Sequence, residues 1–248
     1  MKSLLYKIKS KISKEYNLYM CKKNQDGKTV WLSLGENCLP DDILSRFHLK
    51  SYSSPFASCR SNIDYLIEMH TNKYGNLFDE NSVSKFSLDG GTVLRSIVYN
   101  KSHPIYHDLH TNGFEFTHHN WIDNPDLKQS LQRRLQRMVS DIGCKDFVFL
   151  YHHRMTESSD TQKIRLKLSL FADFFTSNYK KCKIIFFYQN LTSKNSERRV
   201  ITKDLNDNVL EYEIITTHAW EGSNQNIFWA RVDNDLLKTM IESAKNHI

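Results

Sequence analysis

Two almost uninterrupted apolar stretches, with a helical pattern between them, most constrain how this chain can fold. Residues 146–151 have the sequence DFVFLY and residues 183–188 have KIIFFY, which is typical of strands buried on both faces of a parallel sheet. Between them, Ile164, Leu168 and Phe171 recur at helical spacing. This order predicts an α/β fold: a three-layer, mostly parallel sheet with helices on both faces and a Rossmann-like topology.

The N-terminal segment differs in charge from the rest of the chain. Residues 1–30 contain eight lysines against one glutamate and one aspartate, so they carry all of the net charge of +6. Their apolar residues, Leu4, Leu5, Ile8 and Ile12, fall on one face of a short amphipathic helix. We expect a basic amphipathic arm over residues 1–28 and a single α/β domain of catalytic type over residues 29–248. The arm can pack on the domain, or residues 1–20 can lie on an anionic membrane surface.

Composition and motifs exclude several classes of protein. The five cysteines are odd in number and form no C-x-x-C pair, which argues against a disulfide framework and a zinc ribbon. The chain has no P-loop, G-x-G-x-x-G or G-x-S-x-G motif, and residues 31–248 are neutral overall. We expect no cofactor, no metal and no nucleic-acid partner. Without a long apolar run or a signal-peptide pattern, a cytoplasmic protein is expected, with a peripheral position at the inner face of the membrane as a variant.

The sequence around Cys38 places a thiol where a strand gives way to a helix. An apolar strand reaches Gly35, Cys38 follows, and Pro40 opens a helical pattern. Exposed N–H groups and the positive end of the helix dipole favour a thiolate or an oxyanion at such a position. Asp41 and Asp42 compete for that positive end and would raise the pKa of the thiol. Cys38 is a candidate nucleophile, and a buried structural cysteine is the alternative.

Reactive side chains follow several predicted strands, at the edge where parallel sheets bind ligands. They are Cys38, His118, His119, His152, His153, Arg154, Gln189, Asn190 and His218. The alternation over residues 113–118 predicts a strand with His118 on its apolar face, where burial would lower the pKa of the imidazole. His118 is therefore either a general base or a strand-end histidine without a catalytic role. His218 is the reserve candidate for the base.

A second group of side chains is suited to substrate binding. Arg134 flanks the buried face of the helix that begins near Pro125, where it could clamp a phosphate or carboxylate. Arg154, directly after a strand, is a similar candidate. Asn37, His152 and His153 complete the group of substrate-binding candidates. His107 and His110, in contrast, are expected to be polar histidines of a loop.

Three further segments can be assigned from composition and periodicity. Residues 76–91 are polar and contain glycines, so loops or short turns are expected. Residues 193–208 are polar and highly charged, which favours a flexible loop. Residues 227–232 have the pattern of a strand, and residues 236–244 that of a closing helix.

Several blocks of the sequence together resemble a known family, the bacterial family described as putative papain-like cysteine peptidases. The blocks are SLGENC at residues 33–38, Pro55-Phe56, FTHH at residues 116–119, and the helix with Arg133, Arg134 and Arg137 that precedes the strand of residues 147–154. The resemblance covers roughly residues 29–190. Members of this domain family of unknown function are often met among surface-polysaccharide genes.

By this resemblance, Cys38 is the family cysteine and His118 the family histidine. The family usually has Asp-Trp after Pro-Phe and Asp after the histidine, whereas this chain has Ala57-Ser58 and His119. If either aspartate orients the base, the activity is lost or another group replaces it, such as Asp108, Asp123 or Asn120. The papain label implies a helical half joined to an antiparallel sheet, whereas the alternating strands and helices favour the α/β class.

Together these features predict a cysteine-dependent acyl hydrolase or acyltransferase that acts on a glycan, an acylated small molecule or a surface-polymer precursor. In this hypothesis Cys38 is the nucleophile, His118 is the base, and N–H groups at the helix start bind the oxyanion. One alternative is a glycosyl- or phosphoryl-transferring enzyme of capsule or lipopolysaccharide biosynthesis, in which Arg134 and Arg154 grip the donor. The other is a non-catalytic subunit docked on a membrane through the basic arm.

Overall fold

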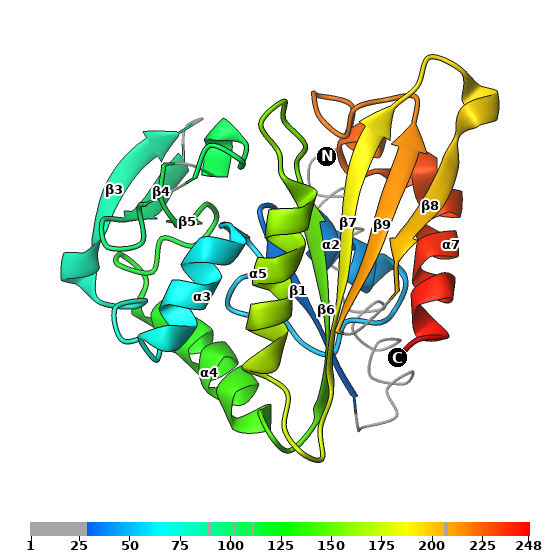
Figure 1. Cartoon of the computed structure of the whole chain (residues 1–248). Helices are drawn as coiled ribbons and strands as arrows, with labels where there is room; N and C mark the ends of the chain where they lie inside the picture. The colour runs from blue at the N-terminus through cyan, green and yellow to red at the C-terminus, as the bar shows by residue number, and fades with distance from the viewer. Residues whose placement is uncertain (1–28, 89–90, 102, 111, 206–207) are drawn as a thin grey trace, which may run out of the picture.

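The fold is built on a five-stranded sheet (Figure 1). The computed structural model describes residues 29–88, 91–101, 103–110, 112–205 and 208–248. In spatial order the strands are β1 (Thr29–Gly35), β6 (Asp146–His153), β7 (Cys182–Leu191), β9 (Val209–Thr216) and β8 (Arg199–Asp204). The first four are parallel, and β8 pairs antiparallel with β9. The predicted α/β class with a mostly parallel sheet is confirmed.

The register of the sheet aligns the carboxyl ends of its central strands. Gly35 of β1 lies opposite His152 of β6, and His153 lies opposite Tyr188 of β7. The residues that follow β1 and β6 therefore emerge at the same edge. The strand order advances from β1 to β9 in one direction, without the reversal of a doubly wound sheet, so the Rossmann-like topology is not confirmed.

Alternate side chains of the strands enter two different hydrophobic cores. Phe149 and Ile184 belong to one, which also contains residues of α3 (Ile63–Thr71), α4 (Pro125–Asp141) and α5 (Thr161–Asp173). Leu150 and Ile185 belong to the other, with residues of α2 (Leu39–Arg46) and α7 (Asn234–Lys245). The helices predicted from Pro125 onward, over residues 164–171 and over residues 236–244 are therefore confirmed.

A smaller antiparallel sheet lies between α2 and β6 in the chain and brings further residues to the site. Its strands, in spatial order, are β2 (Cys59–Arg60), β5 (Glu115–Phe116), β4 (Gly91–Ser96) and β3 (Val83–Leu88). Phe114, Phe116 and Trp121 are almost completely buried beneath it. Because Arg60 pairs with Glu115 across β2 and β5, this sheet fixes the position of the Arg60 backbone.

Short helical turns connect these elements. They are η1 (Glu80–Ser82), η2 (Asp108–His110), η3 (Asn195–Glu197), α6 (Gln225–Phe228) and η4 (Arg231–Asp233). The helical turn α6 is capped by Asn224, whose side chain accepts a hydrogen bond from the Asn226 N–H. This turn forms one wall of the site described below.

Three predictions from composition and periodicity are wrong. Residues 76–91 include strand β3 and residues 193–208 include η3 and strand β8. The polar character of β8 reflects its place at the edge of the sheet, where Lys203 pairs with Glu213 of β9 at 2.6 Å. Residues 227–232 contribute to α6 and η4 and form no strand. For β3 and β8, pairing with the following strand decides a conformation that composition does not reveal.

The predicted arm of residues 1–28, with its amphipathic helix and the proposed membrane contact of residues 1–20, lies outside the residues that the structure describes. Among the described residues, every helix is too short or too polar to cross a bilayer.

Candidate functional site

The site is organised by the turn that joins β1 to α2. Cys38 occupies the N-cap of α2, with φ −80° and ψ −5°, so the predicted thiol at a helix entrance is confirmed. The turn before it is tight: a Cβ added to Gly35 would lie 2.7 Å from the Asn37 carbonyl oxygen. A side chain at Gly35 would therefore displace the backbone that positions Cys38.

The first N–H groups of α2 are partly used within the turn. The Leu39 N–H donates to Oδ1 of Asn37 at 3.0 Å, and the next residue, Pro40, has no N–H. The Asp42 N–H donates to the Cys38 carbonyl oxygen at 3.2 Å. An oxyanion site at this helix start therefore cannot rely on the N–H groups of Leu39 or Asp42.

The surroundings of Cys38 keep its thiol protonated at neutral pH. Burial, and after it the negative charge of Asp41, raise the pKa of the thiol to about 11, while Arg60 acts in the opposite direction. Asp41 is held in place because it accepts hydrogen bonds from Ser33 Oγ at 3.1 Å and from Lys50 Nζ at 2.7 Å. Burial and Asp41 together thus disfavour a resting thiolate.

Asn37 is fixed by a neutral histidine of β6. Because Asn37 Oδ1 accepts from Leu39, its Nδ2 amide faces Nδ1 of His152 at 3.1 Å and donates to it. His152 therefore carries its proton on Nε2. Burial lowers the pKa of this imidazole to about 3, and the ring stacks on Phe187 with 4.9 Å between the centroids. His152 thus positions Asn37 next to the candidate nucleophile.

A buried carboxylate, Glu36, ties the end of β1 to the end of β6. Its Oε1 accepts hydrogen bonds from Tyr151 Oη and His153 Nδ1, both at 2.7 Å, and its Oε2 accepts from the Arg154 N–H at 3.0 Å. Burial alone would raise the pKa of this carboxyl, but His153, His110 and the Arg154 N–H outweigh it and lower the pKa to about 2. Glu36 is therefore a carboxylate that holds the backbone of Arg154 in place.

A cavity of about 380 Å³ opens beside Cys38. It brings together four of the predicted site residues, Asn37, Cys38, His118 and Arg154. It also contains residues that the sequence did not single out, among them Arg60, His110, Trp220, Phe228 and Trp229. The family cysteine and histidine of the resemblance therefore line one cavity. Among the described residues, no hydrogen bond joins the Cys38 sulfur to an imidazole.

His118 lies outside the strand that was expected to carry it. Strand β5 ends at Phe116, and His118 is exposed at the cavity, so the prediction of an apolar surrounding for this histidine is wrong. Its neighbour His119 is half-buried instead. Burial, Arg134 and His118 together lower the pKa of His119 to about 4.

His110 is a residue that sequence reasoning missed. It was expected to be a polar loop histidine, but it is 1% exposed and lines the same cavity as Cys38. Within the part of the chain that the structure describes, neither ring nitrogen of His110 has a hydrogen-bond partner, and Nε2 lies 3.9 Å from Oε2 of Glu36. Burial lowers the pKa of His110 to about 4, so the imidazole is neutral at pH 7.

A second cavity of about 330 Å³ adjoins the first, because Arg154 and Trp220 line both. His152, His153, Gln189 and Asn190, all predicted at the carboxyl edge of the sheet, line it as well. Both ring nitrogens of His153 are bonded, Nδ1 to Glu36 and Nε2 to Ser159 at 2.8 Å. These bonds favour a structural role for His153, and its assignment to substrate binding stays a prediction.

Several other candidates lie away from the two cavities. His218 is exposed and lines neither of them, and its carbonyl oxygen accepts from Nε2 of Gln189 at 2.8 Å. Arg134 lines neither cavity. Burial lowers the pKa of its guanidinium, and Asp41 and Cys59 act in the opposite direction. Two of the three groups proposed to orient His118 are engaged elsewhere: Asp123 binds Lys85 at 2.5 Å, and Asn120 donates to Asp123 at 2.7 Å.

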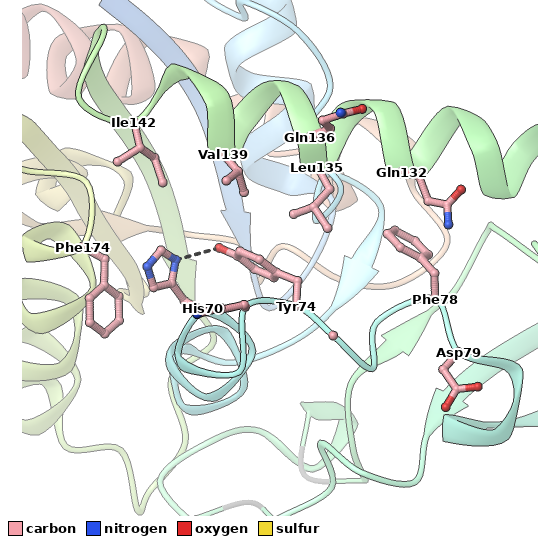
Figure 2. A pocket seen from close by; sticks show the side chains of 12 residues that line it. His70, Tyr74, Phe78, Asp79, Gln132, Leu135, Gln136, Val139, Ile142 and Phe174 are labelled. Carbon is pink, nitrogen blue, oxygen red and sulfur yellow. Dashed lines mark hydrogen bonds between the residues drawn. The ribbon is translucent and has the colours of Figure 1, made fainter.

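A third cavity, of about 1030 Å³, is larger than these two and shares no lining residue with them. Figure 2 shows its lining, in which Leu135, Val139 and Ile142 from α4 and its end face His70 and Tyr74. Nδ1 of His70 lies 3.0 Å from the Tyr74 hydroxyl. Cys38 and the imidazoles discussed above are absent from this lining, so size alone does not locate the site.

Over the described ranges, no group of three or more His, Cys, Asp or Glu side chains is arranged so that it could hold a metal ion. A family model described as "putative papain-like cysteine peptidase" matches residues 29–215. No curated protein and no solved structure matches the chain.

Proposed function

Because the chain belongs to the family of putative papain-like cysteine peptidases, we propose that it is a thiol hydrolase with Cys38 as its nucleophile. One observation carries the proposal: Cys38, at the N-cap of α2, lines a single cavity together with the imidazoles of His110 and His118. A thiol at a helix start beside a proton acceptor is the arrangement that nucleophilic catalysis needs.

His118 acts as the general base in this proposal. It accepts the proton of Cys38 Sγ as the sulfur forms a bond to the acyl carbon, and it returns that proton to the leaving group when the acyl bond breaks. Water then attacks the thioester and restores the thiol. His110 is a weak acceptor, because burial lowers the pKa of its imidazole to about 4, whereas the pKa of the Cys38 thiol is about 11.

The acyl group is proposed to belong to a glycan or another surface-polymer precursor, with transfer to a hydroxyl as the variant in which that hydroxyl replaces water. Support comes from the aromatic side of the cavity, formed by Trp220, Phe228 and Trp229. Aromatic rings of this kind can cover the apolar face of a sugar or an acyl chain.

A second candidate function is glycosyl or phosphoryl transfer, with Cys38 as a packing residue. It is favoured by the raised pKa of the thiol and by the lack, among the described residues, of an imidazole bonded to the sulfur. This candidate predicts that nucleotides or nucleotide sugars stabilise the protein. It also predicts full activity after iodoacetamide treatment, which the thiol hydrolase does not.

The test of the proposal compares Cys38→Ala and Cys38→Ser with Cys144→Ala, since Cys144 is an exposed cysteine away from the cavity. With p-nitrophenyl acetate as substrate, both Cys38 variants should lose on the order of 10³-fold or more in kcat/KM. Cys144→Ala should retain wild-type activity. The free energy of unfolding of each variant should stay within about 1 kcal/mol of wild type. Hydrolysis that persists in folded Cys38→Ala would refute a catalytic cysteine. If Cys38→Ala does not fold, residual hydrolysis by folded Cys38→Ser at the wild-type rate would refute it.

A further inference from the structure

We infer that the substrate of this site carries an anionic group, a carboxylate or a phosphate, which Arg60 and Arg154 bind next to Cys38. Both guanidinium-bearing side chains line the cavity that contains the thiol. The inference rests on the proposed function, because it takes the bound anion to be part of a substrate. The binding of an anion beside Cys38 can nevertheless be tested without turnover.

Arg154 is placed to bind a ligand and has no competing partner close by. Its N–H is anchored on Glu36 at 3.0 Å, and its half-buried side chain lines both cavities. Among the described residues, no carboxylate oxygen lies within 4.0 Å of its guanidinium. Glu221, which lines the second cavity, and Glu36 lie farther away and favour the charged form of the guanidinium. The guanidinium is therefore free to form a bidentate pair with an anion.

Arg60 supplies a second cation that is only partly neutralised. Its Nη1 lies 3.5 Å from Oε2 of Glu115, while the same carboxylate binds Arg95 more closely, at 2.6 Å. The charge of Arg60 reaches the thiol, because it acts to lower the pKa of Cys38 against the larger effects of burial and Asp41. An anion bound by Arg60 would therefore lie near the reacting sulfur.

The two arginines repel each other, and the described lining of this cavity contains no acidic side chain. Glu115 beside Arg60, and Glu221 and Glu36 near Arg154, offset the repulsion only from outside the lining. After burial, Glu221 and Glu36, Arg60 is among the groups that act on the pKa of Arg154. Close by, His110 is 1% exposed with both ring nitrogens unbonded among the described residues. Like charges and an unsatisfied polar ring in one cavity are each costly. A bound anion would offset both.

The rest of the lining limits where the remainder of the substrate can lie. Leu109 and Phe228 line the cavity and are 38% and 37% exposed, so part of the cavity rim is apolar, beside the exposed His118 and Gln225. A substrate with an acyl or sugar portion at this rim would place its anionic group toward Arg60 and Arg154. The substrate class is thus an acyl compound with a carboxylate or phosphate close to the scissile bond.

The test compares two alkylating agents of similar size, neutral iodoacetamide and anionic iodoacetate, on the full-length protein. Peptide mass spectrometry gives the alkylation rates of Cys38 and of Cys144, which is exposed and serves as the internal reference. The ratio of the iodoacetate rate to the iodoacetamide rate should be at least about fivefold higher at Cys38 than at Cys144, because two nearby cations attract the anionic reagent.

Variants assign the effect to the two arginines. Arg154→Gln and Arg60→Gln should each lower the ratio at Cys38 toward the value at Cys144, whereas Arg133→Gln, on the exposed face of α4, should leave it unchanged. Inorganic phosphate and acetate are then added separately: the one that slows alkylation of Cys38 at the lower concentration identifies the class of anion. A thermal melt of each variant shows whether it is folded.

Equal ratios at Cys38 and Cys144 in the wild-type protein would overturn the inference, and so would a ratio that folded Arg60 and Arg154 variants do not change. These outcomes are independent of the proposed function. If Cys38 prefers iodoacetate but Cys38→Ala still hydrolyses the ester, the anion site stands and the thiol hydrolase falls. The opposite pattern leaves the hydrolase and removes the anion site.

Discussion

In the proposed mechanism, the Cys38 thiol loses its proton during the reaction rather than before it. Burial and Asp41 raise the pKa of the thiol to about 11, so only a very small fraction is ionised at pH 7. A stable thiolate and imidazolium pair would need an imidazole bonded to the sulfur, and none is found among the described residues. A nucleophilic role for Cys38 would therefore require a general base, as a serine nucleophile does.

The two imidazoles of the cavity should differ in their kinetic effects. His118→Asn should lower kcat by about 10²- to 10⁴-fold, because it removes the proton acceptor. His110→Asn should raise KM more than it lowers kcat, since this buried ring lines the cavity without serving as the base. His247→Asn, at an exposed position near the end of the chain, is the matched control. A larger loss of kcat in His110→Asn than in His118→Asn would assign the base to His110.

Residue-level reasoning from the sequence succeeded where the cue was local. Gly35, Cys38 and Pro40 specify a strand, a tight turn and a helix start within a few residues, and Cys38 lies at the N-cap as predicted. It failed where neighbours come from distant segments. His110 is buried by other parts of the chain, and its burial is not encoded in its own loop.

At the scale of elements, Glu36 joins the ends of β1 and β6 and so sets the geometry of the turn that carries Cys38. Its partners Tyr151, His153 and Arg154 all come from β6 and the residue after it. The sequence places Glu36 just after an apolar strand, but it cannot tell that three groups of another strand surround the carboxylate. The only signal in the sequence for this buried carboxylate was one acidic residue directly after the buried strand and Gly35.

Replacing this carboxylate should destabilise the junction between the strands. Glu36→Gln removes the charge that pairs with His153, and the free energy of unfolding should fall by about 3 kcal/mol. Urea unfolding of the full chain measures the loss. Glu157→Gln, at an exposed position close to the same region of the chain, should change it by less than about 0.5 kcal/mol. Equal stabilities of the two variants would show that the buried pair contributes nothing.

Element predictions held for segments whose periodicity decides their structure. The parallel strands β6 and β7 and the helix α5 between them were all predicted, because buried strands and amphipathic helices leave clear apolar patterns. Strand β8 was missed because a polar edge strand is defined by its pairing with β9. The end of β5 at Phe116 was missed for a similar reason, and this error placed His118 on the wrong kind of surface.

For the whole molecule, burial of neutral histidines predicts a loss of stability in mild acid. Burial lowers the pKa of His110 to about 4 and that of His152 to about 3, against 6.5 in an unfolded chain. Between these values the unfolded state binds more protons than the folded state, so the free energy of unfolding falls as the pH falls from about 6.5 toward 3. Glu36 adds a further loss below about 4.5, because its pKa in the folded state is about 2.

The melting temperature measured from pH 8 to pH 3 tests this expectation. It should be nearly constant above pH 7 and should begin to fall below about pH 6.5, before most carboxylates titrate. Folded His110→Asn should show a smaller decrease between pH 6.5 and pH 4.5 than the wild-type protein. A melting temperature that stays flat from pH 7 to pH 4.5 would mean that these histidines are not held neutral by burial.

The most direct measurement of the proposed chemistry is the mass of the Cys38 peptide during turnover. The wild-type protein is mixed with p-nitrophenyl acetate and quenched in acid within the first turnovers, and the peptides are analysed by mass spectrometry. A thioester intermediate predicts an acetyl group on Cys38 of the wild-type protein at early times. This group should disappear when the reaction is left to run to completion before the quench. Sustained ester hydrolysis with Cys38 unmodified at every time point would contradict a cysteine nucleophile.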